Sequence, residues 1–87
     1  MAVSQNKSDG SKRPSTLTFE RAELVAIGQR VRAGRVASGL TQQELADLTG
    51  LHRVTINRFE TGQLDPRLSN VLTASRALNI PIAVLLG

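Results

Sequence analysis

The sequence predicts an all-α fold made of short helices, and three observations support this prediction. Apolar residues recur at three- and four-residue steps, which is the spacing of one helix face. Residues 41–44 (TQQE) have the pattern of a capping box, which marks the start of a helix. Gly39, Gly50 and Gly62 follow segments of helical periodicity, at positions where a left-handed residue ends a helix.

The first helix is expected over residues 19–38, with Leu24, Ile27 and Val31 on its apolar face. Thr18 is the expected cap of this helix. Residues 1–16 are rich in Ser, Lys, Asn, Gly and Pro and lack apolar periodicity. Such a segment cannot bury enough apolar surface to offset its ordering entropy. We therefore expect a disordered basic tail over residues 1–18 and one folded domain over residues 19–87.

Two short helices are expected next, on either side of Gly50. Thr41 caps the first of them, and Leu40 and Leu45 form its hydrophobic staple. The second covers residues 52–61 and points Ile56 and Phe59 inward. The helical period places four side chains away from that apolar face: Arg53, Val54, Asn57 and Arg58.

The last third of the chain predicts a fourth helix and a short apolar end. Asp65 is read as the N-cap and Pro66 as the first helical residue. The inward stripe of this helix is Leu68, Val71, Leu72, Ser75 and Leu78, and the helix ends near Asn79. Residues 80–86 fit either a fifth helix from Pro81 or a strand, since Ile82 and Val84 are β-branched.

Composition excludes several classes of function. The 87 residues contain no cysteine and a single histidine, so neither a disulfide nor a thiolate metal site can form. No apolar run approaches the ~20 residues of a membrane span. The sequence has neither a glycine loop that could cradle a phosphate nor a carboxylate pair with a recognisable catalytic role, so it does not suggest an enzyme. We expect a cytoplasmic, non-enzymatic protein with no cofactor, no metal, no membrane partner and no small-molecule ligand. Its net charge of +4 is weak evidence for a nucleic-acid partner.

Two short helices joined around a glycine form a helix-turn-helix unit. Residues 39–46 (GLTQQELA), Gly50 with Leu51, Thr55 with Ile56 and residues 60–62 (ETG) resemble the Cro/C1-type (Xre) repressor family. The resemblance covers roughly residues 24–87. It implies a five-helix, lambda-repressor-like DNA-binding domain whose third helix lies in the major groove.

The resemblance also implies roles for individual residues. By this resemblance, three residues of the third helix fall at base-reading positions: Arg53, Val54 and Arg58. Gln42 falls where a residue contacts a phosphate and supports the neighbouring base-reading side chain. Arg67 falls where a basic residue approaches the DNA backbone or a narrow minor groove. The chemistry agrees, because arginine fits the O6/N7 edge of guanine and valine suits a thymine methyl group. We therefore expect at least one guanine in each half-site.

Further residues complete the expected interface. Asn57 joins the base-reading set, and Gln43, His52 and Thr61 join the backbone contacts. His52 stands where the family usually has a small hydroxyl residue, so it is either a phosphate contact or merely an exposed ring. Arg35 and Glu60 match a charge pair that ties the first helix to the third, and we interpret them as structural.

The leading hypothesis is a sequence-specific regulator of transcription that binds double-stranded DNA. A homodimeric repressor on a palindromic operator is expected, with half-sites about 34 Å apart. Its dimer surface is expected at the fifth helix and the end of the fourth, where Ile82, Val84, Leu85 and Leu86 supply apolar area. The alternative hypothesis is the antitoxin subunit of a toxin–antitoxin pair, which would repress its own operon and bind a toxin protein.

Overall fold

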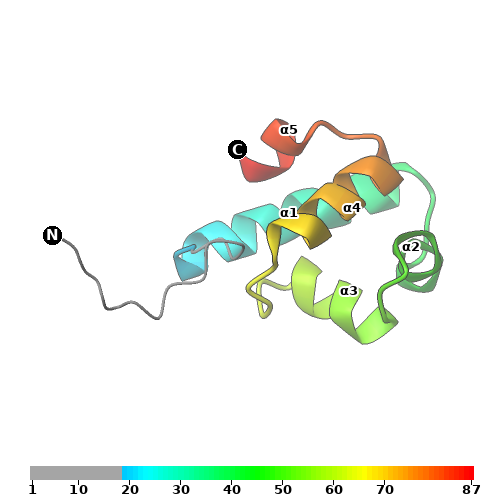
Figure 1. The fold of residues 1–87 in the computed structure, drawn as a ribbon, viewed down its shortest axis with the longest axis horizontal. Helices are drawn as coiled ribbons and strands as arrows, with labels where there is room; N and C mark the ends of the chain where they lie inside the picture. The colour runs from blue at the N-terminus through cyan, green and yellow to red at the C-terminus, as the bar shows by residue number, and fades with distance from the viewer. Residues whose placement is uncertain (1–18) are drawn as a thin grey trace, which may run out of the picture.

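The computed structural model describes residues 19–87, which form five helices and no strand (Figure 1). They are α1 (Arg21–Ala37), α2 (Gln42–Thr49), α3 (Arg53–Glu60), α4 (Leu68–Leu78) and α5 (Ile82–Leu86). The predicted all-α, five-helix fold is confirmed. The expected tail over residues 1–18, and Thr18 as a cap, lie outside the described residues. No helix of this part of the chain is long and apolar enough to cross a membrane.

Helix α1 begins and ends close to where the sequence predicts. Its N-cap is Glu20, whose backbone N–H donates to Oε1 of Glu23 over 2.8 Å. At its other end Gly39 is left-handed (φ 72°), and the N–H of Leu40 bonds to the Arg35 carbonyl over 3.1 Å. The glycine turn closes the last carbonyls of α1 and sends the chain directly into α2.

Helix α2 has the predicted capping box. The Thr41 N–H donates to Glu44 Oε1 over 2.8 Å, and the Glu44 N–H donates to Thr41 Oγ1 over 3.0 Å. Gly50 then adopts φ 74° and ends the helix, with its N–H bonded to the Ala46 carbonyl over 2.9 Å. The capping box at one end and the left-handed glycine at the other limit α2 to eight residues.

The predicted start of α4 is wrong. Its N-cap is Arg67, not Asp65, and the helix begins at Leu68. Pro66 is fully buried, and the backbone at Arg67 is extended (φ −75°, ψ 153°). The chain is therefore still extended at Arg67, one residue after the buried proline. The expected inward stripe is also wrong at Leu68, which is 40% exposed, while Ala74 belongs to the core.

The segment after Asn79 is a helix and not a strand. Asn79 is left-handed (φ 55°) and ends α4. Ser75 holds the turn, because its carbonyl accepts the Ile80 N–H over 2.9 Å and its hydroxyl donates to the Ile80 carbonyl. Pro81 then leads into α5.

One core joins the five helices. Helix α1 packs against α3, α4 and α5, while α2 packs against α3 and α4. In Figure 1, α3 and α5 lie on opposite sides of α1. The buried apolar residues are Ile27, Val31, Leu45, Ala46, Ile56, Phe59, Val71, Ala74, Leu78 and Leu85. This core fixes one side of α3 and leaves its other side on the surface.

Candidate nucleic-acid interface

The outward face of α3 carries the four predicted base-reading residues. Arg53 and Asn57 are four residues apart, as are Val54 and Arg58, so the four side chains share one side of the helix. All four are exposed, and Val54 is 51% exposed. On the opposite side Ile56 and Phe59 are buried in the core. The helix is thus anchored on one side and free to contact a partner on the other.

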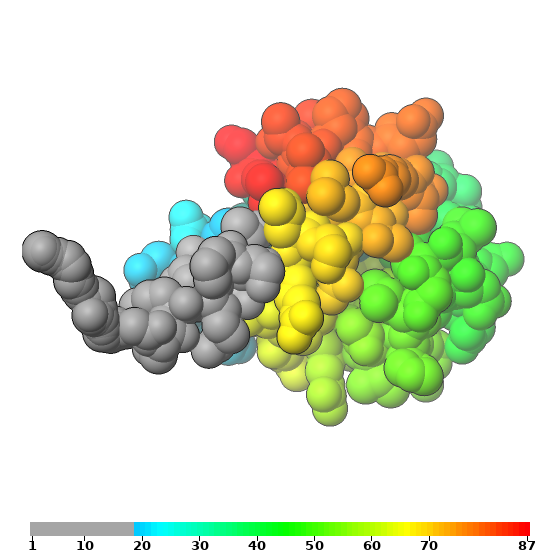
Figure 2. Space-filling model, viewed as in Figure 1, coloured from blue at the N-terminus to red at the C-terminus, as the bar shows by residue number. Residues whose placement is uncertain are grey.

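The two arginines of this face have no internal partner among residues 19–87: no ion pair or hydrogen bond within that range holds Arg53 or Arg58. Guanidinium groups that spend no donors on residues 19–87 keep all five for other partners. Figure 2 shows the side chains of α2 and α3 forming one continuous surface at the end of the molecule away from α5.

The turn between α2 and α3 is held by a residue that the sequence reading missed. Thr49 Oγ1 donates to the Leu45 carbonyl over 2.8 Å and lies 3.3 Å from the Leu51 N–H, which donates to it. The N-cap of α3 is His52, which is exposed and makes no capping bond with its side chain. The first N–H groups of α3 are therefore not capped by that residue.

A buried ion pair joins α1 to the end of α3. Arg35 Nε lies 2.6 Å from Glu60 Oε2, and Arg35 Nη2 lies 3.1 Å from Glu60 Oε1. The Glu60 side chain is 1% exposed and that of Arg35 is 11% exposed. The hydrogen bond to Glu60 raises the pKa of Arg35 above its ordinary value; desolvation opposes this shift and the Glu60 charge adds to it. Arg35 Nη1 also donates to the Leu40 carbonyl over 2.7 Å, directly before α2.

Three of the expected backbone contacts already have partners inside the protein. Gln42 Nε2 donates to Glu60 Oε1 over 3.1 Å, and Gln43 Nε2 donates to Asp47 Oδ1 over 3.0 Å. Thr61 Oγ1 donates to the Asn57 carbonyl over 2.9 Å. Arg67 is exposed at the N-cap of α4. Contact of any of these residues with DNA stays a prediction.

Arg30 has a structural role that no sequence signal indicated. Its Nη1 donates to the Leu85 carbonyl over 3.2 Å, so α1 holds the last turn of α5. Nothing in the spacing of Arg30 distinguishes it from the exposed arginines of α1, because the carbonyl comes from a helix 55 residues further along.

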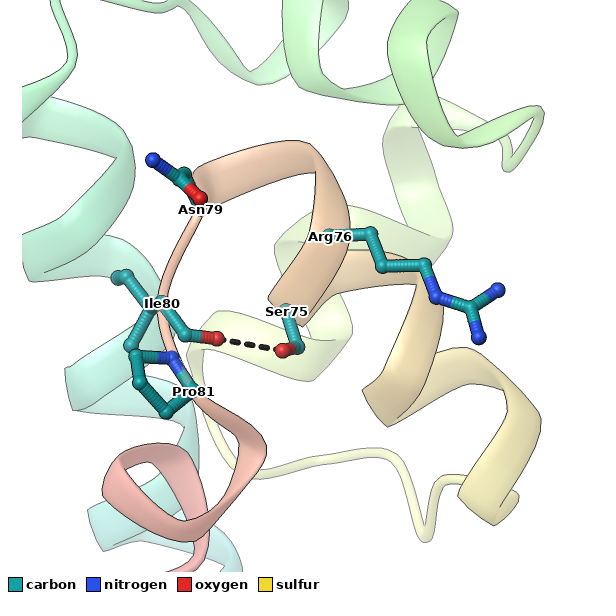
Figure 3. A pocket seen from close by; sticks show the side chains of 5 residues that line it. All are labelled: Ser75, Arg76, Asn79, Ile80 and Pro81. Carbon is teal, nitrogen blue, oxygen red and sulfur yellow. Dashed lines mark hydrogen bonds between the residues drawn. The ribbon is translucent and has the colours of Figure 1, made fainter.

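A shallow pocket lies at the turn between α4 and α5 (Figure 3). Ser75, Arg76, Asn79, Ile80 and Pro81 line it, and Arg76 extends away from Ile80 and Pro81. Within the described residues no group of three or more His, Asp or Glu side chains is placed to hold a metal ion. The outward face of α3, with its exposed arginines, is the candidate site.

Comparison with known proteins identifies the class to which this fold and surface belong. Residues 31–85 match the helix-turn-helix family, and the chain belongs to this family of Cro/C1-type DNA-binding domains. The restriction-modification controller protein C.AhdI from Aeromonas hydrophila is 44% identical, with a TM-score of 0.71 over 74% of this chain and 97% of that one.

Two further relatives extend the comparison. The control protein C.SmaI of Serratia marcescens is 33% identical over 69% of this chain and 71% of its own. The P22 c2 repressor, solved with a synthetic operator, is 32% identical, with a TM-score of 0.66 over 69% of this chain and 91% of that one. These relatives are regulators rather than enzymes. The chain spans only 30% of the length of another curated relative.

Proposed function

We propose that this protein is a sequence-specific regulator of transcription, a repressor that binds a palindromic operator in double-stranded DNA as a homodimer. One observation carries the proposal: the outward face of α3 presents two arginines, a valine and an asparagine on a helix whose other side is buried. An α-helix fits the major groove, where arginine pairs with guanine and valine contacts the thymine methyl group.

Contacts with the DNA backbone would fix the position of α3. Gln42, Gln43, His52, Thr61 and Arg67 are the residues proposed for this role. Phosphate contacts supply affinity and register, whereas base contacts supply sequence discrimination. Support comes from the P22 c2 repressor, whose structure contains an operator and superimposes on this chain.

The homodimer is proposed to form through α5. Val84 is 56% exposed and Leu86 is 37% exposed, while Ile82 is partly buried. Leu85 was expected to contribute, but it is fully buried in the core of its own chain and is not available. Two copies joined away from α3 would place one recognition helix in each half-site, about 34 Å apart.

The test is selection of binding sites from random duplex DNA with the full chain, followed by sequencing and a salt titration of the enriched site. The proposal expects a palindromic, guanine-containing motif bound by two chains. The log–log salt slope, about −0.9 per neutralised phosphate, then counts the ionic contacts. Enrichment of no motif, with only weak and salt-sensitive binding, would contradict sequence-specific recognition.

Similarity to C.AhdI favours a second, narrower candidate, which is control of a restriction–modification system. A selected motif lying upstream of nuclease or methyltransferase genes would support it. The antitoxin alternative uses the same DNA-binding face, and it predicts that a small protein encoded nearby co-purifies with this chain. If the motif lies upstream of neither gene type and the chain purifies alone, both narrower candidates are contradicted. The general proposal of a repressor then remains.

A further inference from the structure

Glu60 is the meeting point of three helices. Oε2 of Glu60 lies against Arg35 Nε at 2.6 Å, and Oε1 accepts from both Arg35 Nη2 and Gln42 Nε2, each at 3.1 Å. Glu60 is the last residue of α3, Gln42 is the first residue of α2, and Arg35 comes from α1. One carboxylate thus joins the end of the recognition helix to the residue at which α2 begins.

This contact fixes the direction of the Gln42 amide. A carboxylate accepts hydrogen bonds and cannot donate them, whereas a glutamine amide has a donor end and an acceptor end. Only the Nε2 end of Gln42 can therefore face Glu60. The amide nitrogen has two hydrogens, so one remains for a second acceptor. Without the carboxylate, the amide could turn over and present its oxygen instead.

We propose that Glu60 is a positioning residue for DNA binding, because it orients the Gln42 amide so that the second Nε2 hydrogen meets a phosphate oxygen. This inference rests on the proposed function and explains how one contact at that site is prepared. Arg35 assists this role, because its positive charge offsets the negative charge of the Glu60 carboxylate. Without Arg35 that carboxylate would repel the phosphate. The side chain of Glu60 is 1% exposed, so it acts through Gln42 and not by touching DNA.

A purely structural role would also make Glu60 important, because its ion pair joins α1 to α3. A double-mutant cycle separates the two roles. The four proteins are the full-length parent, Gln42→Met, Glu60→Gln and the double variant. Affinity for the selected duplex is measured at one salt concentration, at a temperature where circular dichroism shows all four folded.

We expect Glu60→Gln to weaken binding about tenfold to 150-fold in the parent, the size of one hydrogen bond to a charged group. In the Gln42→Met background the same change should weaken binding less than about twofold, because the glutamine that Glu60 positions is already absent. Equal factors in both backgrounds would overturn the positioning role and leave the proposed function standing. A parent that binds no duplex would overturn both.

Gln29→Met is the matched control, since Gln29 is an exposed glutamine of α1. It should leave affinity within about twofold, and a loss equal to that of Gln42→Met would overturn the phosphate contact. Should Glu60→Gln not fold, side-chain amide NMR of the parent gives the answer. We expect one Gln42 Nε2 proton to be shifted and slow to exchange, relative to Gln29. Two solvent-like protons would overturn the inference.

Discussion

The main chains of α1 and α3 touch at Gly28 and Phe59. A Cβ atom on Gly28 would overlap the Phe59 carbonyl oxygen and would lie 2.7 Å from that of Glu60. Both obstructing atoms are backbone, which cannot turn aside as the end of a side chain can. The crossing of α3 over α1 is therefore set by direct backbone contact, close to the Arg35–Glu60 ion pair.

Replacing Gly28 with alanine should destabilise the fold by about 1–3 kcal/mol, because the added methyl group forces the helices apart. Gly34→Ala is the matched control in the same helix. Its Cβ would meet the flexible end of Ile80, and alanine is the better helix former by about 1 kcal/mol. Urea unfolding of both variants measures the difference. Equal stability of the two would contradict a rigid contact at Gly28.

Removal of one partner of the buried ion pair should be costly. Arg35→Ala leaves the Glu60 carboxylate buried and unpaired, so we expect a loss of about 3–5 kcal/mol in the free energy of unfolding. Arg32→Ala, at an exposed position of the same helix, should change it by no more than about 0.5 kcal/mol. Thermal and urea denaturation report both values, and an unchanged melt of Arg35→Ala would refute the structural role.

The pH dependence of the stability that the Arg35–Glu60 ion pair contributes follows from the direction of the pKa shift of Arg35. The pKa of Arg35 is raised in the folded protein, chiefly by its hydrogen bond to Glu60. A raised pKa stabilises the fold at every pH below the unfolded value, and the gain is lost only in strong alkali. The stability difference between parent and Arg35→Ala should therefore be flat between about pH 7 and pH 9. A steep change in urea midpoints across this window would point to another group.

The capping box of α2 should contribute measurably. Thr41→Ala removes the acceptor of the Glu44 N–H, and we expect a cost of about 1 kcal/mol. Thr41→Ser keeps the hydroxyl and should retain most of the stability. Chemical denaturation followed by circular dichroism compares the two. A serine variant as weak as the alanine variant would show that the methyl group, and not the hydrogen bond, matters.

Arg53 and Arg67 should differ in how their loss affects DNA binding. Arg53→Ala should cost about 1–3 kcal/mol at the guanine position of the site and relax selectivity there. Arg67→Ala should weaken all sequences equally and reduce the salt slope by about 0.9. Titrations of single-base variants of the selected duplex measure both effects. A uniform loss for Arg53→Ala would remove it from the base-reading set.

The sequence predicted the elements whose signals are local. The capping box at Thr41 and Glu44, and the left-handed glycines at Gly39, Gly50 and Gly62, lie as expected. Each of these signals depends on a few neighbouring residues, so no knowledge of the tertiary structure was needed. The outward placement of Arg53 and Arg58 followed in the same way, from helical period alone.

The features that the sequence did not predict depend on tertiary packing. Asp65 and Pro66 fit a helix start locally, but Pro66 is buried in the folded chain and α4 begins only at Leu68. The bond from Gln42 to Glu60 joins residues 18 apart, and the bond from Arg30 to Leu85 joins residues 55 apart. No periodicity or cap pattern encodes such pairs, because they exist only after the helices have packed.

The shortness of α3 limits how much information one copy of this domain can read. Its eight residues span about 12 Å. That length reaches about four base pairs, enough to distinguish about 256 sequences. Two copies raise the figure to about 65,000, against the roughly 10⁶–10⁹ competing sites of a genome. A regulator built on α3 therefore gains its remaining discrimination by repetition along the DNA, or from the shape of base pairs that it never touches.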